Sequence, residues 1–207
     1  MPDGLSIVAL RQTSPGRITL ALSDGSEIKT TLNVVTDLRL FSGKTLDEEA
    51  LAEIRTASSL AQTRNRALDL LSRRPMSCKE LYDKLIQKGE EERAAAASIQ
   101  WLLENRLLDD ESYAASVARH YAAKGYGAGR VRAELNRRGV PRELWDGALG
   151  QMPAQNDKLM KFISSRLTEP GDRDQLRKVS AALFRRGYSW EEIRAALRQF
   201  EAEIEEE

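Results

Sequence analysis

RVRAELNRRG, at residues 130–139, is the middle copy of a pattern that occurs three times in this chain of 207 residues. The other copies are ELYDKLIQKG at 80–89 and KVSAALFRRG at 178–187. Each has an apolar residue, a leucine four positions later, a base and a final glycine. The apolar pair marks one buried helix face, and the glycine suits the left-handed residue that ends a helix. The glycines are 50 and 48 residues apart, which predicts a repeat protein.

Each copy lies between two further predicted helices, so the predicted repeat unit has three helices. The preceding helices cover 67–71, 113–121 and 159–167, and each glycine is followed by a short turn and a third helix. Units this small bury little apolar surface alone, so three units are expected to stack into an elongated, curved array. The residues of the repeat signature are Leu81, Leu85, Gly89, Asp109, Asp110, Tyr113, Ala114, Val131, Leu135, Gly139, Val179, Leu183 and Gly187.

The N-terminal segment differs from the repeats, because it has short apolar or alternating runs separated by turn residues. The runs cover 6–10, 17–22 and 27–32, with Pro-Gly and Asp-Gly between them, and predict a small three-stranded antiparallel meander. A short helix from residue 33 and a long helix capped by Asp47 follow. The predicted fold is therefore mainly α, with a β extension at the N-terminus. The predicted boundaries are 1–45 for the β meander and short helix, 46–108 for the long helix and first repeat, 109–150 for the second, 151–200 for the third and 201–207 for an acidic tail.

The net charge of zero hides an uneven distribution along the chain. Residues 64–198 carry 26 basic and 19 acidic side chains, whereas the last nine residues carry five glutamates and no base. This asymmetry favours a polyanion or a charged protein as partner. A single cysteine allows no internal disulfide, and no apolar run approaches the length of a membrane span. We therefore expect a cytoplasmic monomer with no membrane contact.

The residues that carry catalytic chemistry are few and lack partners in the sequence. His120 is the only histidine, and Cys78 lies at a predicted helix start without the pattern of a reactive thiol. The glycine-rich stretch 125–129 follows no strand, so it is interpreted as a turn between helices. The acidic cluster 109–111 is interpreted as a helix cap rather than a metal site. We expect no enzyme activity, no metal and no cofactor.

Basic residues return at equivalent positions of the three repeats, which predicts that they share one side of the array. Several weak contacts on one body act together as a multivalent surface, so these bases are the predicted partner-binding residues. Trp101, Trp145 and Trp190 are expected to pack between helices, with base stacking as the alternative. The predicted surface, named the basic stripe below, consists of Lys84, Lys88, Arg130, Arg132, Arg137, Arg138, Lys178, Arg185 and Arg186.

These motifs, taken in order, resemble those of the RecX family of bacterial regulators of the RecA recombinase. The resemblance rests on the three signature ends, on LDDESYA at 108–114, and on Lys124-Gly125 followed by Arg130. In the N-terminal segment, LSDGSE at 22–27 and FSGK at 41–44 resemble the β extension of longer members. The resemblance implies a non-catalytic protein that binds RecA filaments on single-stranded DNA. It implies inhibition of recombinase, ATPase and coprotease activities, and so modulation of recombinational repair and of the SOS response.

Two other functions remain open from the residues alone. Three-helix units resemble helix-turn-helix domains, so the chain is alternatively a direct DNA-binding module. The zero net charge and the acidic end argue for weak rather than tight DNA binding in the absence of RecA. The third alternative is a helical-repeat scaffold for another protein.

Overall fold

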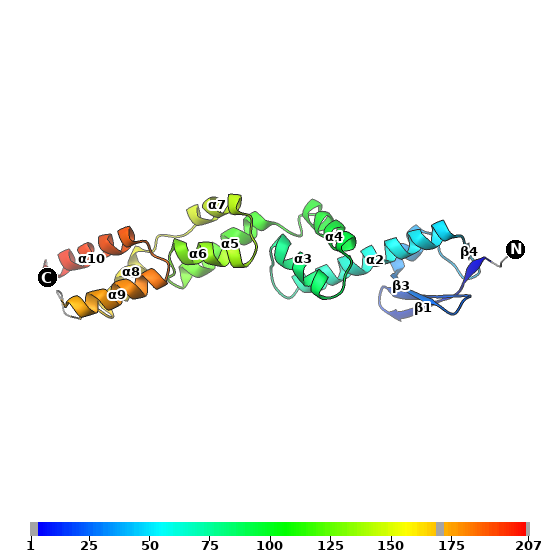
Figure 1. The fold of residues 1–207 in the computed structure, drawn as a ribbon, viewed down its shortest axis with the longest axis horizontal. Coiled ribbons are helices and arrows are strands. Elements are labelled where there is room, and N and C mark those ends of the chain that lie inside the picture. The colour runs from blue at the N-terminus through cyan, green and yellow to red at the C-terminus, as the bar shows by residue number, and fades with distance from the viewer. Residues whose placement is uncertain (1–3, 169–171, 206–207) are drawn as a thin grey trace. The chain divides into compact units, whose positions relative to one another are not determined.

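The computed structural model describes residues 4–168 and 172–205, and it divides into two compact units. The first unit comprises Met1–Met76 and Glu80–Leu108, and the second comprises Ser77–Lys79 and Asp109–Glu207. The prediction of a mainly helical chain with three three-helix repeats and an N-terminal sheet is confirmed (Figure 1). The elements, in chain order, are β1 Leu5–Ser14, β2 Arg17–Leu22, β3 Glu27–Thr31, α1 Leu32–Asp37, β4 Thr45–Leu46, α2 Glu48–Leu71, α3 Cys78–Gln87, α4 Glu92–Glu104, α5 Asp110–Ala123, α6 Ala128–Arg137, the 3-10 helix η1 Arg142–Leu144, α7 Trp145–Gly150, α8 Asn156–Ser164, α9 Arg173–Arg185 and α10 Trp190–Glu205.

The N-terminal sheet contains the three predicted strands and one more. Its order is β3-β2-β1-β4, and the neighbours are antiparallel. The additional strand β4 has only two residues, Thr45 and Leu46, which pair with the start of β1. A run this short leaves no alternating pattern in the sequence. One face of the sheet is closed by α2, whose Ile54 is 2% exposed and packs with Ile7 and Leu20 of the sheet.

Helix α2 connects the sheet to the first repeat. Asp47 caps it as predicted, because its carboxylate accepts a hydrogen bond from the Ala50 amide at 2.7 Å. Buried Ser58 then donates to Thr30 Oγ1 of β3 at 2.8 Å. The C-terminal half of α2 packs with α4, so one helix serves both the sheet core and the first repeat.

The second and third repeats each enclose a small apolar core. In the second, the buried residues Val131 and Leu135 of α6 pack with Tyr113 of α5. In the third, Val179 and Leu183 of α9 form a cluster with residues of α8 and α10. Ser189 and Glu192 form a capping box at the start of α10, in which each backbone amide donates to the other side chain. Helix α10 continues to Glu205 through part of the predicted acidic tail. Residues 206–207 of that tail lie outside the described residues.

The signature glycines end their helices as predicted. Gly89, Gly139 and Gly187 have φ of 84°, 67° and 90°. The amide after each glycine donates to the signature leucine carbonyl, at 3.1 Å to Leu85, 3.0 Å to Leu135 and 3.2 Å to Leu183. This six-residue bond is the Schellman motif, which satisfies a carbonyl that the helix itself leaves without a donor.

Two of these glycines have a second role, because another helix begins directly against them. At the end of α9, the Arg186 carbonyl accepts from Gly127 N at 3.0 Å and the Gly187 carbonyl accepts from Gly129 N at 2.9 Å. The carbonyls at the C-terminal end of α9 thus accept hydrogen bonds from the amides at the N-terminal end of α6. The negative end of one helix dipole lies against the positive end of the other. At the end of α6, the Arg138 carbonyl accepts from the Ser77 hydroxyl. The glycine-rich turn at 125–129 is therefore a joint between helices.

The three glycines differ in the space around them. A Cβ at Gly187 would lie 2.1 Å from Arg130 N, and one at Gly139 would lie 2.7 Å from Lys79 Cδ. A Cβ at Gly89 would meet no atom within 4 Å. Gly89 is needed only for its backbone conformation, whereas Gly187 also allows two backbones to touch.

Replacing these glycines by alanine one at a time is expected to cause unequal losses of stability. Gly89→Ala carries only the cost of a left-handed alanine, about 1 kcal/mol. Gly187→Ala carries that cost and also forces the contact between α9 and α6 to open. Gly139→Ala is expected to lie between them, because the nearest atoms to a Cβ there would be side-chain atoms of Lys79, including its Cβ at 2.9 Å, rather than backbone atoms. Thermal unfolding followed by circular dichroism measures the three losses, and equal losses would contradict the second role of Gly187.

Candidate functional site

The residues of the basic stripe lie in different surroundings. Two belong to the first unit, where Lys84 is half-buried and Lys88 is exposed. The other seven belong to the second unit, and only some of them leave their charge free. That the stripe as a whole contacts a partner stays a prediction. In the second unit the exposed members are Arg130, Arg132, Arg137, Lys178 and Arg185, and the half-buried members are Arg138 and Arg186.

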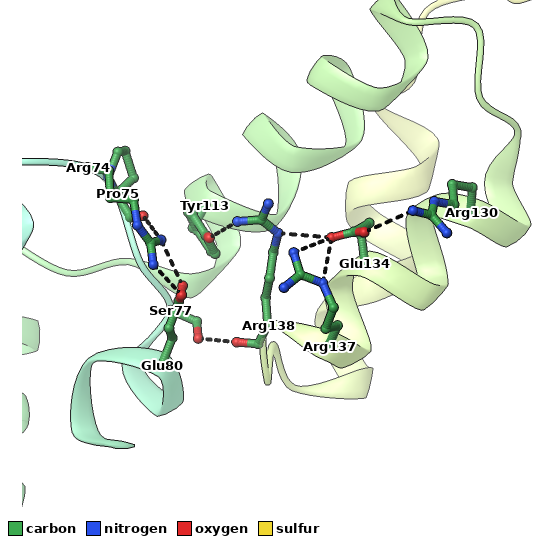
Figure 2. A network of polar contacts seen from close by, with 9 residues as sticks. All are labelled: Arg74, Pro75, Ser77, Glu80, Tyr113, Arg130, Glu134, Arg137 and Arg138. Atoms are coloured by element: carbon green, nitrogen blue, oxygen red, sulfur yellow. Dashed lines mark hydrogen bonds and ion pairs between the residues drawn. The ribbon is translucent and has the colours of Figure 1, made fainter. Parts of the chain in front are cut away.

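Three arginines of the stripe converge on one buried carboxylate (Figure 2). Glu134 on α6 is 5% exposed. Arg137 donates to Glu134 Oε2 from Nη2 at 2.8 Å and from Nε at 3.1 Å, and Arg130 and Arg138 each approach a Glu134 oxygen at 3.4 Å. Burial alone would raise the pKa of Glu134, but the hydrogen bond and charge of Arg137, with help from Tyr121 and Arg138, lower it.

The structure gives Arg138 a structural role in the second unit. Its guanidinium donates to the hydroxyl of buried Tyr113 at 2.7 Å, and its carbonyl accepts from Ser77 (Figure 2). Glu134 was not predicted as a functional or structural residue from the repeat pattern. The sequence nevertheless contains a signal for this cluster. Arg130, Arg137 and Arg138 stand at i−4, i+3 and i+4 from Glu134, the spacings at which side chains of one helix meet.

Arg186 is also held inside the second unit. Its guanidinium donates to the Gly125 carbonyl at 3.3 Å and lies over the rings of Tyr126 and Phe162, at 5.4 Å and 4.6 Å from their centroids. Cation–π contacts of this kind fix a guanidinium more firmly than water does.

Arg132 and Arg185 are the members whose charge is available beside a groove. The groove has a volume of about 610 Å³ and lies between α6 and the α9–α10 turn. Both arginines line it, are exposed, and form no hydrogen bond or ion pair with any part of the chain that the structure describes. Phe184 also lines the groove and is 52% exposed.

The tryptophans do not all pack as predicted. Trp101 is half-buried beneath Arg64, at 4.9 Å, and half-buried Trp145 donates from Nε1 to the Val140 carbonyl at 3.0 Å. For Trp190 the prediction of core packing was wrong, since it is 51% exposed and stacks on Phe184 with ring centroids 5.1 Å apart. Helical spacing gave no signal for an exposed ring, because Trp190 stands three and seven residues before Ile193 and Leu197, which pack in the core of the third repeat.

The acidic cluster acts as a helix start, as predicted. Asp109 caps α5 by accepting from the amides of Glu111 and Ser112, and Asp110 accepts from Cys78 N at 2.8 Å. Burial, with the nearby charge of Asp110, raises the pKa of the Cys78 thiol to about 12. Within residues 4–168 and 172–205, no cluster of histidine, cysteine and carboxylate side chains is arranged to hold a metal ion.

Comparison with known proteins decides the family. The models of the first, second and third three-helix domains of RecX match residues 64–102, 109–149 and 165–197. Regulatory protein RecX of Xanthomonas axonopodis pv. citri is 38% identical over 157 residues, which are 74% of this chain and 97% of that protein. The chain belongs to the RecX family. RecX of Vibrio parahaemolyticus is 36% identical over 63% of this chain and 86% of its own length.

Solved structures agree with this assignment. A crystal structure of regulatory protein RecX matches with a TM-score of 0.75 and 26% identity, over 96% of this chain and 99% of that one. RecX from Lactobacillus salivarius shares the fold, with a TM-score of 0.66 over 70% of this chain and 99% of its own. The relatives are named as regulatory proteins, and members of the RecX family are non-catalytic. Among the described helices, none is both long and apolar enough to span a membrane.

Removing the Glu134 carboxylate is expected to destabilise the second unit. Glu134→Ala leaves three arginines facing one another, and because solvent screens the exposed Arg130 and Arg137 side chains the expected loss is about 1 kcal/mol. Folding lowers the pKa of Glu134 below its ordinary value of 4.5. The ionised Glu134 therefore stabilises the folded protein at a pH above 4.5, and this stabilisation is lost as the pH falls from 4.5 toward the pKa of the folded state. Urea unfolding at neutral and acidic pH measures this difference. Exposed Glu143→Ala is the control, and a similar loss in both variants would contradict the role of Glu134.

The Cys78 thiol is expected to react slowly in the folded protein. At pH 8 a thiol with a pKa of about 12 is almost entirely protonated, and the thiolate is the reactive form. Asp110→Asn removes a neighbouring charge and keeps an acceptor for Cys78 N, so labelling should become faster. The absorbance released by dithionitrobenzoate gives the rates. Labelling of the native protein as fast as that of the unfolded protein would contradict the prediction.

Proposed function

We propose that this RecX-family chain binds RecA filaments on single-stranded DNA and lowers their ATPase, recombinase and coprotease activities. The family membership supports a regulatory role, and the motif resemblance supports RecA as the partner. Acting without catalysis, the chain would stabilise one filament state by binding it more tightly than the others.

The observation that carries a docking role is the groove beside Arg132 and Arg185. The guanidinium groups of Arg132 and Arg185, which form no ion pair within the described chain, line this groove together with Phe184. The exposed ring of Phe184 stacks on the exposed ring of Trp190. Aromatic rings and arginine are enriched in the cores and hot spots of protein–protein interfaces. These half-exposed rings gain apolar burial when a partner covers them.

Eight of the nine residues of the basic stripe divide into two groups under this proposal, and half-buried Lys84 is assigned to neither. Arg132 and Arg185, with exposed Lys88 and Lys178, are the members proposed to face the filament. Arg130, Arg137, Arg138 and Arg186 hold the second unit together through Glu134 or the neighbouring rings. Charge reversal of this second group would damage the fold and would not report on binding.

Reversing the two groove arginines is expected to weaken inhibition of the RecA ATPase. Arg132→Glu with Arg185→Glu places negative charge where the partner is proposed to dock, and we expect at least about a tenfold higher protein concentration for half-inhibition, equivalent to about 1.4 kcal/mol. ATP hydrolysis by RecA on single-stranded DNA, titrated with each variant, is the measurement. Unchanged helicity in circular dichroism shows that the variant is folded.

A matched control carries the same change of charge in the first unit. Arg73 and Arg93 are exposed and form no side-chain hydrogen bond or ion pair within the described chain, so Arg73→Glu with Arg93→Glu should inhibit as the parent does. Full inhibition by the groove variant would remove the groove from the proposal. An unchanged ATPase rate with saturating parent protein at low salt would refute the proposal itself.

Trp190→Ala is expected to weaken inhibition without a change of charge. Removing the ring exposes Phe184 alone and takes away half of the stacked pair. The same ATPase titration, repeated at low and high salt, separates this loss from an electrostatic one, because apolar contacts are less screened. Inhibition equal to that of the parent protein at both salt concentrations would exclude the ring pair from the interface.

A further inference from the structure

A second pocket of the second unit collects positive charge from outside the basic stripe. It has a volume of about 370 Å³, and the described residues that line it include five basic residues and no carboxylate. Only one of the five belongs to the stripe, so the repeat pattern did not reveal the pocket. The five are Lys124, Lys158, Lys161, Arg166 and Arg186.

Helix ends bring these cations together. Lys124 is the C-terminal cap of α5, Lys161 lies in the last turn of α8, and Arg166 follows α8. Lys158 Nζ donates to the carbonyls of Ala122 and Ala123, both at 2.9 Å, at the end of α5. The negative ends of helices stabilise nearby cations, which helps to explain how the pocket forms without a carboxylate among its described lining residues.

Two of the lining arginines lie over one lining ring. Arg166 lies over Phe162 at 4.0 Å and Arg186 over the same ring at 4.6 Å. The series continues beyond the pocket, where Arg186 also lies over Tyr126 at 5.4 Å, and Arg130 over Tyr126 at 5.9 Å. The Phe162 ring therefore holds Arg166 and Arg186 close together, although no described carboxylate forms an ion pair with either.

Three of the cations keep their charge available. The side chains of Lys124 and Lys161 are exposed and form no hydrogen bond or ion pair with residues that the structure describes. The exposed Arg166 side chain donates to Ser165 Oγ at 3.2 Å and, among the described residues, to no other group. Like charges held this close repel one another, and a bound anion relieves the repulsion.

We propose that this pocket binds the phosphate backbone of a nucleic-acid strand, without sequence preference. A phosphodiester chain supplies successive negative charges to separate cations, and arginine binds phosphate oxygens with two parallel hydrogen bonds. Arg166 is stacked on Phe162 and solvent-exposed, so its planar group is available for a base to stack on. The carboxylates of an acidic peptide would pair with the cations of the pocket, but they offer no planar ring to stack on the Arg166 guanidinium.

This inference is independent of RecA, so it is tested with the full chain and DNA alone. Fluorescence anisotropy of a labelled oligothymidylate gives the association constant at several salt concentrations. Lys124→Ala with Lys161→Ala is expected to lower affinity at low salt at least tenfold. It should also make the slope of log K against log salt shallower by about 1.4, the change expected for two lost phosphate contacts on a single strand.

The control is Arg73→Ala with Arg93→Ala, which removes the same charge from the first unit and should keep the slope of the parent protein. Polyglutamate at equal charge concentration is expected to leave the oligothymidylate bound. An equal loss in both double variants, displacement by polyglutamate, or no binding by the parent protein at low salt would each overturn the proposal. Inhibition of RecA measured separately is not affected by these outcomes.

Discussion

The second unit depends on a backbone contact that leaves no room for a side chain. The last carbonyls of α9 accept hydrogen bonds from the first amides of α6, and Gly187 stands where a Cβ would lie 2.1 Å from Arg130 N. Helix ends are costly to bury because their amides and carbonyls lack partners within the helix. Here each end supplies the partners of the other, with opposite ends of two helix dipoles together. The joint also positions what surrounds it, since Arg130 and Arg186 lie beside it and bracket the ring of Tyr126.

The basic side chains of the second unit have two different roles: some stabilise the fold and others are exposed to solvent. Glu134 draws three arginines inward, and the carbonyls and rings near Gly125 and Phe162 hold Arg186. Arg132 and Arg185 on one side, and Lys124 and Lys161 on another, keep their charge for solvent or a partner. A regulator without catalytic groups acts only through what it binds, so the separation of these two groups of cations matters more for its function than the total charge.

Much of the helical architecture was predictable from residues close in sequence. The capping residues Asp47 and Asp109, the capping box at Ser189 and the left-handed glycines all follow from contacts within a few positions. The two-residue strand β4 was missed because so short a strand has no pattern of its own. Trp190 was assigned to a core because large aromatic rings usually are buried, whereas its position at the start of α10 leaves it half exposed.

The three repeats, the ends of their helices and the family could be identified from residue order alone, because each depends on local spacing and on the order of motifs. Residue order did not reveal which cations are free. Arg138, Arg185 and Arg186 look alike in the repeat pattern, yet Arg138 donates to Tyr113 and Arg186 lies over two rings. This difference arises in the folded protein, because neighbours from other helices determine whether the charge of a side chain is available to a partner.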